Sequence, residues 1–285
     1  MLDIKTLNLD FIVDNERHSV LKNLSLTVPS GATLGIVGES GSGKSVTAYS
    51  VMGLLPKTAE VSGDILWKGQ NLLDYTEEQW ASIRGSEIGL IFQNPQAALN
   101  PVFTVANQMI ETIMLHQHLS KEQARATAIE LLEKVNITNA ADRIDDYPHQ
   151  FSIGMCQRIM IAMTVSMRPK LLIADEPTAS LDVTSQQQIL RLLTEVKSAY
   201  DMDLIIISHD MAVIAEHCDY VAVLYLGEVV ESGKTDSIFK ILFSINTLRK
   251  PFCNKMASSS LIVRLLCGYN GQKIVTVVSS GRPFT

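Results

Sequence analysis

The stretch GESGSGKS, residues 38–45, decides the fold. It has the pattern Gly-x-x-x-x-Gly-Lys-Ser, in which small residues let backbone N–H groups turn inward around phosphate groups. Such a loop needs a strand before it and a helix after it, because the start of a helix favours an anion. The apolar run 33–37 predicts that strand, and residues 45–55 predict a helix that ends at Pro56. This context argues against a chance match in a glycine- and serine-rich surface loop.

The loop therefore predicts an ATP site that uses Mg²⁺. We expect Lys44 to reach the β- and γ-phosphates and Ser45 to ligate the metal. The candidate ATP-binding residues of the loop are Gly38, Glu39, Ser40, Gly41, Ser42, Gly43, Lys44 and Ser45.

A second run, LLIADE at residues 171–176, supplies the other half of such a site. Its apolar part predicts a buried strand that brings Asp175 to the magnesium ion. Glu176 follows by one residue, where its carboxylate can activate water. By itself, an apolar run that ends in Asp-Glu can equally be an ordinary strand end. Together with the phosphate loop, it predicts the second half of a nucleotide site.

The remaining patterns indicate an α/β chain with a helical insertion. Residues 2–28 alternate and predict paired short strands, and residues 63–67 predict another. From residue 103 to about 136 the apolar spacing becomes helical, with a capping box formed by Ser120 and Gln123. The short apolar runs 171–174, 204–207 and 220–224 are separated by helical stretches, which favours buried parallel strands.

Bulk composition limits the possible functions. The chain has 285 residues, 46% of them apolar, and a net charge of −6. This charge gives no general reason to bind nucleic acid, for which a basic face is the usual footprint. The four cysteines are far apart, so we expect unpaired thiols in a reducing compartment. No signal peptide is evident, and no apolar run approaches the roughly 20 residues that span a bilayer. A role at a membrane would therefore depend on a partner.

Several motifs together resemble the ABC-transporter ATPase family over residues 1–240. They are IFQNPQAALNP at residues 91–101, YPHQ at 147–150 and RPKLLIADEPTASLDVT at 168–184. They are most similar to the subfamily that powers dipeptide, oligopeptide and nickel importers. The resemblance implies a P-loop, RecA-like α/β core with an N-terminal antiparallel β subdomain and a helical subdomain at about 94–158.

The resemblance also assigns roles to residues outside the two runs above. Phe11 matches the aromatic residue that stacks on adenine, although it can also be read as a core residue on an edge strand. Gln93 matches the glutamine that senses magnesium and the attacking water, and His209 the histidine at the γ-phosphate. The implied catalytic residues are thus Glu176, His209 and Gln93, and the implied magnesium ligands are Ser45, Gln93 and Asp175. Ser180 and Asp182 match the loop that crosses to a second nucleotide-binding subunit.

The sequence departs from the family in its signature segment. The usual Leu-Ser-Gly-Gly-Gln, often with Met last, is Phe-Ser-Ile-Gly-Met at residues 151–155. Ser152 and Gly154 remain as the candidates for contact with the partner's ATP. Ile153 puts a β-branched side chain where the family has glycine, which is expected to restrict the backbone or block close approach; a harmless variant is the alternative. Cys156 stands where the subfamily usually has Arg.

The family pattern also stops after Phe239. Residues 241–285 contain six Lys or Arg and no Asp or Glu, which marks them as an atypical basic tail unrelated to the family. Its Cys253 and Cys267 cannot by themselves build the iron–sulfur cluster of some relatives.

The resemblance implies the ATP-hydrolysing subunit of an importer for peptides, nickel or another small solute. It would lie at the cytoplasmic face of the cell membrane, held there by two permease subunits. A second homologous ATPase subunit and an extracytoplasmic solute-binding protein would complete the complex. The alternatives are a degenerate subunit that binds ATP but hydrolyses it poorly, and a soluble ABC ATPase that acts on ribosomes or DNA. The latter usually has two cassettes or a long coiled coil, and this sequence has neither.

Overall fold

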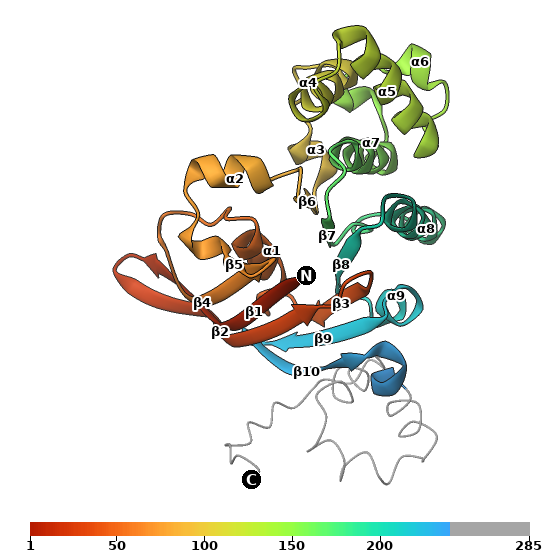
Figure 1. The fold of residues 1–285 in the computed structure, drawn as a ribbon. Helices are drawn as coiled ribbons and strands as arrows, with labels where there is room; N and C mark the ends of the chain where they lie inside the picture. The colour runs from red at the N-terminus through yellow and green to blue at the C-terminus, as the bar shows by residue number, and fades with distance from the viewer. Residues whose placement is uncertain (240–285) are drawn as a thin grey trace, which may run out of the picture. The chain divides into compact units, whose positions relative to one another are not determined.

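The computed structural model describes residues 1–239, whose helices and strands are shown in Figure 1. Residues 1–235 form one compact unit, which contains all the strands from β1 (Leu2–Val13) to β10 (Glu228–Lys234). The tail at 241–285, with its two cysteines, lies outside the described residues. Cys156 and Cys218 are buried free thiols.

An antiparallel sheet of four strands begins the chain, in the order β2-β1-β4-β5. Its strands are β1 (Leu2–Val13), β2 (Glu16–Val28), β4 (Ala59–Trp67) and β5 (Gln70–Asn71). The expected pairing within residues 2–28 is confirmed, but the two strands are long rather than short. Thr6 has φ 47° where the pairing register shifts, and this bulge resets the alternation so that Leu7 and Leu9 are buried as Leu2 and Ile4 are.

The second sheet has six strands in the order β10-β9-β3-β8-β7-β6. All its neighbouring strands are parallel except β9 and β10, and β3, β6, β7 and β8 are buried along their whole length. The strands are β3 (Thr33–Gly38), β6 (Ile88–Ile91), β7 (Leu171–Asp175), β8 (Asp203–Ser208), β9 (Tyr220–Tyr225) and β10 (Glu228–Lys234). The three predicted parallel strands are thereby confirmed.

Helix α1 (Lys44–Val51) follows the phosphate loop and is shorter than predicted. Gly53 takes φ 59°, and its N–H donates to the Ser50 carbonyl while the N–H of Leu54 donates to that of Tyr49. This is the Schellman arrangement, which ends a helix with glycine in the left-handed region. The helix therefore ends at Val51, and Pro56 is not the residue that terminates it.

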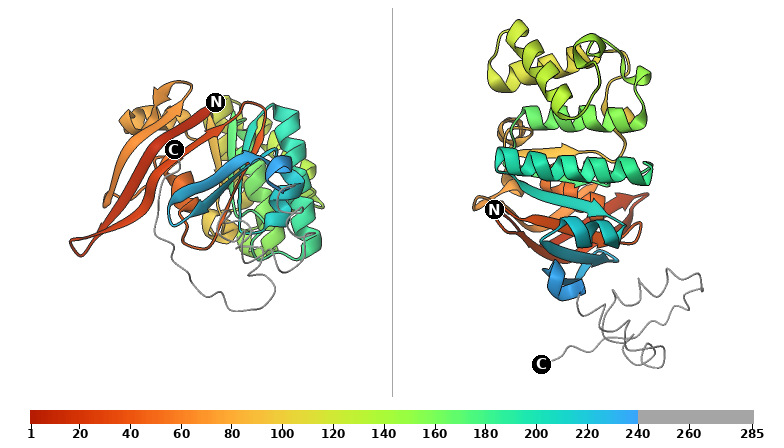
Figure 2. Two further views of the ribbon diagram at one scale, coloured as in Figure 1. Left: turned by 90° about the horizontal axis from the view of Figure 1, so that it is seen from below. Right: turned by 90° about the vertical axis from the view of Figure 1, so that its right-hand side faces the viewer.

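The other helices surround this core or form the insertion (Figure 1). They are α2 (Glu77–Ile83), α3 (Pro95–Ala98), α4 (Val105–Gln117), α5 (Lys121–Lys134), α6 (Ala140–Arg143), α7 (Ile153–Ser166), α8 (Val183–Tyr200) and α9 (Met211–His217), with 3-10 turns η1 (Leu72–Asp74) and η2 (Pro148–Gln150). The capping box of Ser120 and Gln123 is confirmed at the start of α5. Helix α7 continues beyond residue 158 and contacts α8, alongside which it runs in the right-hand view of Figure 2.

Within residues 1–239, no helix has both the length and the apolar character needed to cross a bilayer. The expected architecture, with an antiparallel sheet, a parallel core and an inserted group of helices, is confirmed.

Candidate nucleotide site

Four parallel strands bring their carboxyl ends to one edge of the sheet. Val37 in β3 pairs with Ser208 in β8, whose neighbour Ile207 pairs with Asp175 at the end of β7. Ligands of open α/β sheets bind outside the carboxyl ends of the strands. Residues that follow β3, β6, β7 and β8 are therefore neighbours in space although they are far apart in the sequence.

The loop between β3 and α1 depends on glycine at two positions. Gly41 and Gly43 have φ of 79° and 101°, in the left-handed region that other residues rarely adopt. A Cβ atom on Gly43 would also lie 2.5 Å from a methyl carbon of Leu21. The hydroxyl of Ser42 is buried with no hydrogen-bond partner among the described residues, so the loop holds a polar group ready for a ligand.

Lys44 is buried at the first turn of α1. Its ammonium group donates to the carbonyl oxygens of Gly38 and Glu39, each at 2.9 Å. Burial lowers the pKa of Lys44, while the nearby carboxylates of Glu176 and Asp175 act in the opposite direction. The negative charge of a bound phosphate would offset the desolvation free energy of this buried ammonium group.

Ser45 and Asp175 form the part of the site that fits a metal ion. The Ser45 hydroxyl donates to Oδ1 of Asp175 at 3.0 Å, whereas the buried Oδ2 has no partner among the described residues. Burial raises the pKa of Asp175, because a carboxylate with no solvent is disfavoured. Hydroxyl and carboxylate oxygens are the ligands that Mg²⁺ prefers, so this pair fits the expected ion.

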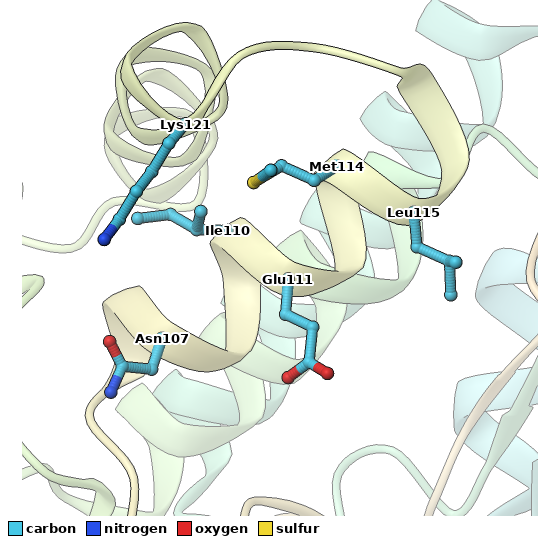
Figure 3. Close-up of a pocket in the computed structure, with 6 residues that line it drawn as sticks. All are labelled: Asn107, Ile110, Glu111, Met114, Leu115 and Lys121. Carbon is cyan, nitrogen blue, oxygen red and sulfur yellow. The ribbon is translucent and has the colours of Figure 1, made fainter.

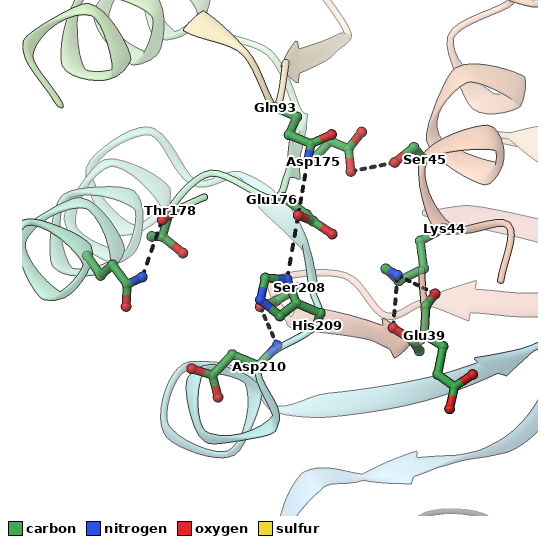
Figure 4. Close-up of polar contacts among 12 residues, drawn as sticks. Glu39, Lys44, Ser45, Gln93, Asp175, Glu176, Thr178, Ser208, His209 and Asp210 are labelled. Carbon is green, nitrogen blue, oxygen red and sulfur yellow. Dashed lines mark hydrogen bonds and ion pairs between the residues drawn. The ribbon is translucent and has the colours of Figure 1, made fainter. Parts of the chain in front are cut away.

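Glu176 lies between Gln93 and His209 (Figure 4). Its Oε2 accepts a hydrogen bond from Nε2 of Gln93 at 3.0 Å and is 3.5 Å from Nδ1 of His209. Glu176 has φ 44°, an uncommon conformation that places its side chain just beyond the strand. The three predicted catalytic residues thus come together from β6, β7 and β8.

Tyr49 belongs to this neighbourhood and was missed by the sequence reasoning. Its ring centroid lies 6.5 Å from that of Phe92, which precedes Gln93. Burial, with the charge of Asp175, raises the pKa of Tyr49. The available signal was its spacing of four residues from Ser45, which puts both on one face of α1.

The signature residues lie apart from this cluster, with no hydrogen bond to it among the described residues. Ser152 is the N-cap of α7, and its hydroxyl accepts from the N–H of Met155 at 3.3 Å. Around Gly154, a Cβ atom would meet only Leu181, at 3.7 Å.

Ile153 does not strain the start of α7, and whether it restricts the backbone at a partner's ATP stays a prediction. Ile153 is the first helical residue of α7 and has no positive φ, so a β-branched residue adopts its conformation without strain. Its side chain is 40% exposed, so a steric effect on a partner subunit stays a prediction.

The remaining candidates also lie outside the cluster. Asp182 is the N-cap of α8, and hydrogen bonds from Ser185 lower its pKa. Ser180, which is exposed, has φ 65°. Phe11 is half-buried against the core on β1, which runs between β2 and β4, so its placement on an edge strand is wrong.

The structure also has a surface hollow of about 530 Å³ (Figure 3). Helix α4 and the start of α5 line it, through Asn107, Ile110, Glu111, Met114, Leu115 and Lys121. It contains none of the candidate ATP-binding residues.

A glycine loop between a parallel strand and a helix, facing an Asp-Glu pair on a second strand, defines a P-loop nucleotide-binding protein. The family model described as ABC transporter matches residues 21–179, and the chain belongs to this family. Membership implies ATP binding and hydrolysis.

Individual relatives agree with this assignment. The chain is 44% identical over 241 residues to the oligopeptide transport ATP-binding protein OppD of Bacillus subtilis, covering 84% of this chain and 67% of the relative. It is also 44% identical to the dipeptide transport ATP-binding protein DppD of Escherichia coli, covering 84% and 73%. A solved dimeric ATP-binding cassette with ADP and Pi has a TM-score of 0.74 at 26% identity, over 82% of this chain and 99% of that one.

The buried carboxylate of Asp175 predicts a measurable effect on stability. Asp175→Asn is expected to raise the melting temperature of the nucleotide-free protein at neutral pH. Because the folded state raises the pKa of Asp175, it binds this proton more tightly than the unfolded chain, and stability falls as pH rises above the unfolded value of about 3.9. Asparagine has no such charge to bury. Each kcal/mol gained corresponds to about 2–4 °C in a chain of this size.

The measurement is thermal unfolding of both proteins at neutral pH and near pH 4, with and without ATP and Mg²⁺. The advantage of the variant should shrink at the lower pH, and the magnesium-dependent stabilisation by ATP should be smaller in the variant. A variant that is less stable than wild type at neutral pH without ligand would contradict the prediction.

Proposed function

We propose that this chain hydrolyses ATP with Mg²⁺ and thereby drives the uptake of peptides through a membrane permease. The observation that carries the proposal is the cluster of Lys44, Ser45, Asp175, Glu176 and Gln93, in a chain whose relatives are named as oligopeptide and dipeptide transport ATP-binding proteins. Translocation of the solute would take place in the permease, since no helix of the described residues can span a bilayer.

In the proposed mechanism these residues have separate roles in phosphate binding, metal binding and proton transfer. Lys44 and the loop N–H groups hold the phosphates, and Ser45 and Asp175 would hold Mg²⁺, which neutralises phosphate charge when it is bound. The carboxylate of Glu176 accepts a proton from the attacking water as the oxygen bonds to the γ-phosphorus and the bond to the ADP oxygen breaks. Gln93 and His209 flank Glu176 and orient that water.

The proposed complex follows the importers that the sequence resembles. A second, homologous ATPase subunit would face this one, with Ser152 and Gly154 acting on the partner's ATP and Ser180 and Asp182 at the dimer contact. Phe11 would stack on adenine. Two permease subunits would hold the pair at the cytoplasmic face of the membrane, and an extracytoplasmic protein would deliver the solute. We also propose that residues 1–240 form the nucleotide-binding domain, with the helical subdomain at about 94–158.

The relatives give no support to the degenerate alternative. The unstrained helical conformation of Ile153 also argues against it.

The test is reconstitution of the full chain with its co-encoded permeases, second ATPase subunit and binding protein in proteoliposomes. Labelled dipeptides and oligopeptides should accumulate only when ATP and Mg²⁺ are supplied at the cytoplasmic side. Nickel ions serve as the control solute. Accumulation of nickel without peptide would overturn the proposed substrate class, and the absence of ATP turnover would overturn the proposed mechanism.

A further inference from the structure

The last residue of helix α6, Arg143, contacts the signature segment 151–155 at two points and the residue just before it at a third. Its guanidinium carbon lies 4.2 Å from the ring centroid of Phe151, within the range of a cation–π interaction. One terminal nitrogen donates to the carbonyl of Gln150 at 3.1 Å, and the other lies 3.6 Å from the sulfur of Met155. These contacts fall on both sides of Ser152, the residue proposed to meet the partner's ATP.

Arg143 is itself fixed from a different direction. Its Nε donates to the carboxylate of Asp146 at 3.1 Å, and both side chains are less than one-third exposed. The backbone beside it is also tied down, because the N–H of Val105 donates to the Asp146 carbonyl at 3.0 Å and that of Ala106 to the Ile144 carbonyl at 2.7 Å. The planar guanidinium, with its donors in a fixed fork, thus joins Asp146 to the turn before α7, and the backbone around Asp146 is in turn bonded to the start of α4.

The turn before α7 is also closed from within, since the N–H groups of Gln150 and Phe151 donate to the carbonyls of Tyr147 and Pro148 and the Tyr147 N–H donates to Oε1 of Gln150 at 2.7 Å. These bonds fix its internal shape, whereas Arg143 ties it to the segment that follows α6. The Ser152 hydroxyl caps α7, and the thiol of Cys156 donates to the carbonyl of Pro148 at 3.3 Å. A thiol is a weak donor, so it holds the turn less firmly than a charged guanidinium does. The ring of Phe151 is buried beneath the Arg143 side chain, and Ser152 follows it directly.

We propose that Arg143 is a positioning residue: it sets the direction in which Ser152 and the first N–H groups of α7 face the second nucleotide site. This inference rests on the proposed function, because it assumes that the signature segment acts on the ATP of a partner subunit. Arg143 touches no reacting atom. It acts on ATP turnover only through residues 150–152 and the first turn of α7, which it holds in place.

A matched control lies in the same group of helices. Arg125 in α5 makes a bidentate ion pair with Asp145, at 2.9 and 2.6 Å, and among the described residues it has no hydrogen bond or ion pair with the signature segment. Arg143→Gln and Arg125→Gln therefore each remove a guanidinium and a carboxylate contact, but only the first releases the turn.

The experiment compares the assembled transporter complex containing wild-type chain, Arg143→Gln, Arg143→Lys or Arg125→Gln. We expect Arg143→Gln to lower kcat for ATP by about tenfold or more, since small displacements of positioning groups can cost up to about 100-fold. ATP binding by the isolated full chain should stay unchanged, because its own phosphate loop is untouched. Arg143→Lys should recover part of kcat, since a lysine keeps the charge over Phe151 but lacks the fork. Arg125→Gln should match wild type.

Turnover is expressed per ATP bound, so that any loss of folded protein cancels. Equal kcat losses from Arg143→Gln and Arg125→Gln, or a loss of ATP binding in proportion to kcat, would mean a merely structural role and overturn the proposal. Ser152→Ala distinguishes a failure of the positioning role of Arg143 from a failure of the proposed role of the signature segment. A loss from Ser152→Ala without a loss from Arg143→Gln refutes the positioning role and leaves the proposed function standing. An active complex that tolerates both changes would overturn the role of the signature segment as well.

Discussion

Replacing Glu176 with Gln is expected to lower ATP turnover of the assembled complex by about 100-fold or more, the usual contribution of a positioned general base. The change is isosteric and keeps a carbonyl oxygen that can accept the hydrogen bond from Nε2 of Gln93. Glutamate and glutamine have the same branching at Cβ, so the substitution does not change the strain of the positive φ at this residue. What disappears is the basic oxygen between Gln93 and His209, so the proton of the attacking water has no acceptor.

The measurement pairs steady-state ATP turnover with ATP binding by the isolated full chain. Binding should be retained, because the phosphate loop and Asp175 are unchanged. Glu195→Gln is the control, since this exposed carboxylate on α8 is far along the helix from the N-cap Asp182. Turnover of Glu176→Gln close to that of wild type would refute its assignment as the base.

Lys44→Ala should instead abolish most of the binding. A hydrogen bond to a charged group contributes about 1.5–3 kcal/mol, so losing it should weaken ATP affinity by roughly 10- to 100-fold. The ammonium also ties together the carbonyls of Gly38 and Glu39, and the loop loses that restraint. Turnover should fall with occupancy and recover in part at high ATP concentration.

Thermal stability separates this loss of binding from unfolding. Burial lowers the pKa of Lys44, which shows that the nucleotide-free fold bears a cost for its charge. Lys44→Met, whose unbranched side chain is only one atom shorter, should therefore bind ATP as poorly as Lys44→Ala without a large fall in melting temperature. Lys68→Ala is the control, since Lys68 lies in the turn between β4 and β5 and pairs with Glu87, outside the nucleotide site. Normal ATP affinity in Lys44→Met would contradict the assignment.

Sequence patterns identified the elements well where the signal is local. The parallel strands were recognised from β-branched apolar runs, and the capping box of α5 from Ser120 and Gln123. The errors have equally local causes. Helix α1 ends early because Gly53 adopts the left-handed conformation, and β1 is longer than expected because a bulge at Thr6 restores its alternation.

By itself the sequence determined the chemistry available to this protein: a phosphate loop at residues 38–45, an Asp-Glu pair, and the family that combines them. Only the tertiary structure decided which side chains meet. Gln93, Glu176 and His209 lie far apart in the chain and come together because the strand order β3-β8-β7-β6 aligns their strand ends. The same holds for Arg143, whose contacts with Phe151 and Met155 depend on the packing of α6 against the start of α7. Spacing along one chain encodes periodicity within an element, whereas contacts between elements depend on how all their apolar faces are buried at once.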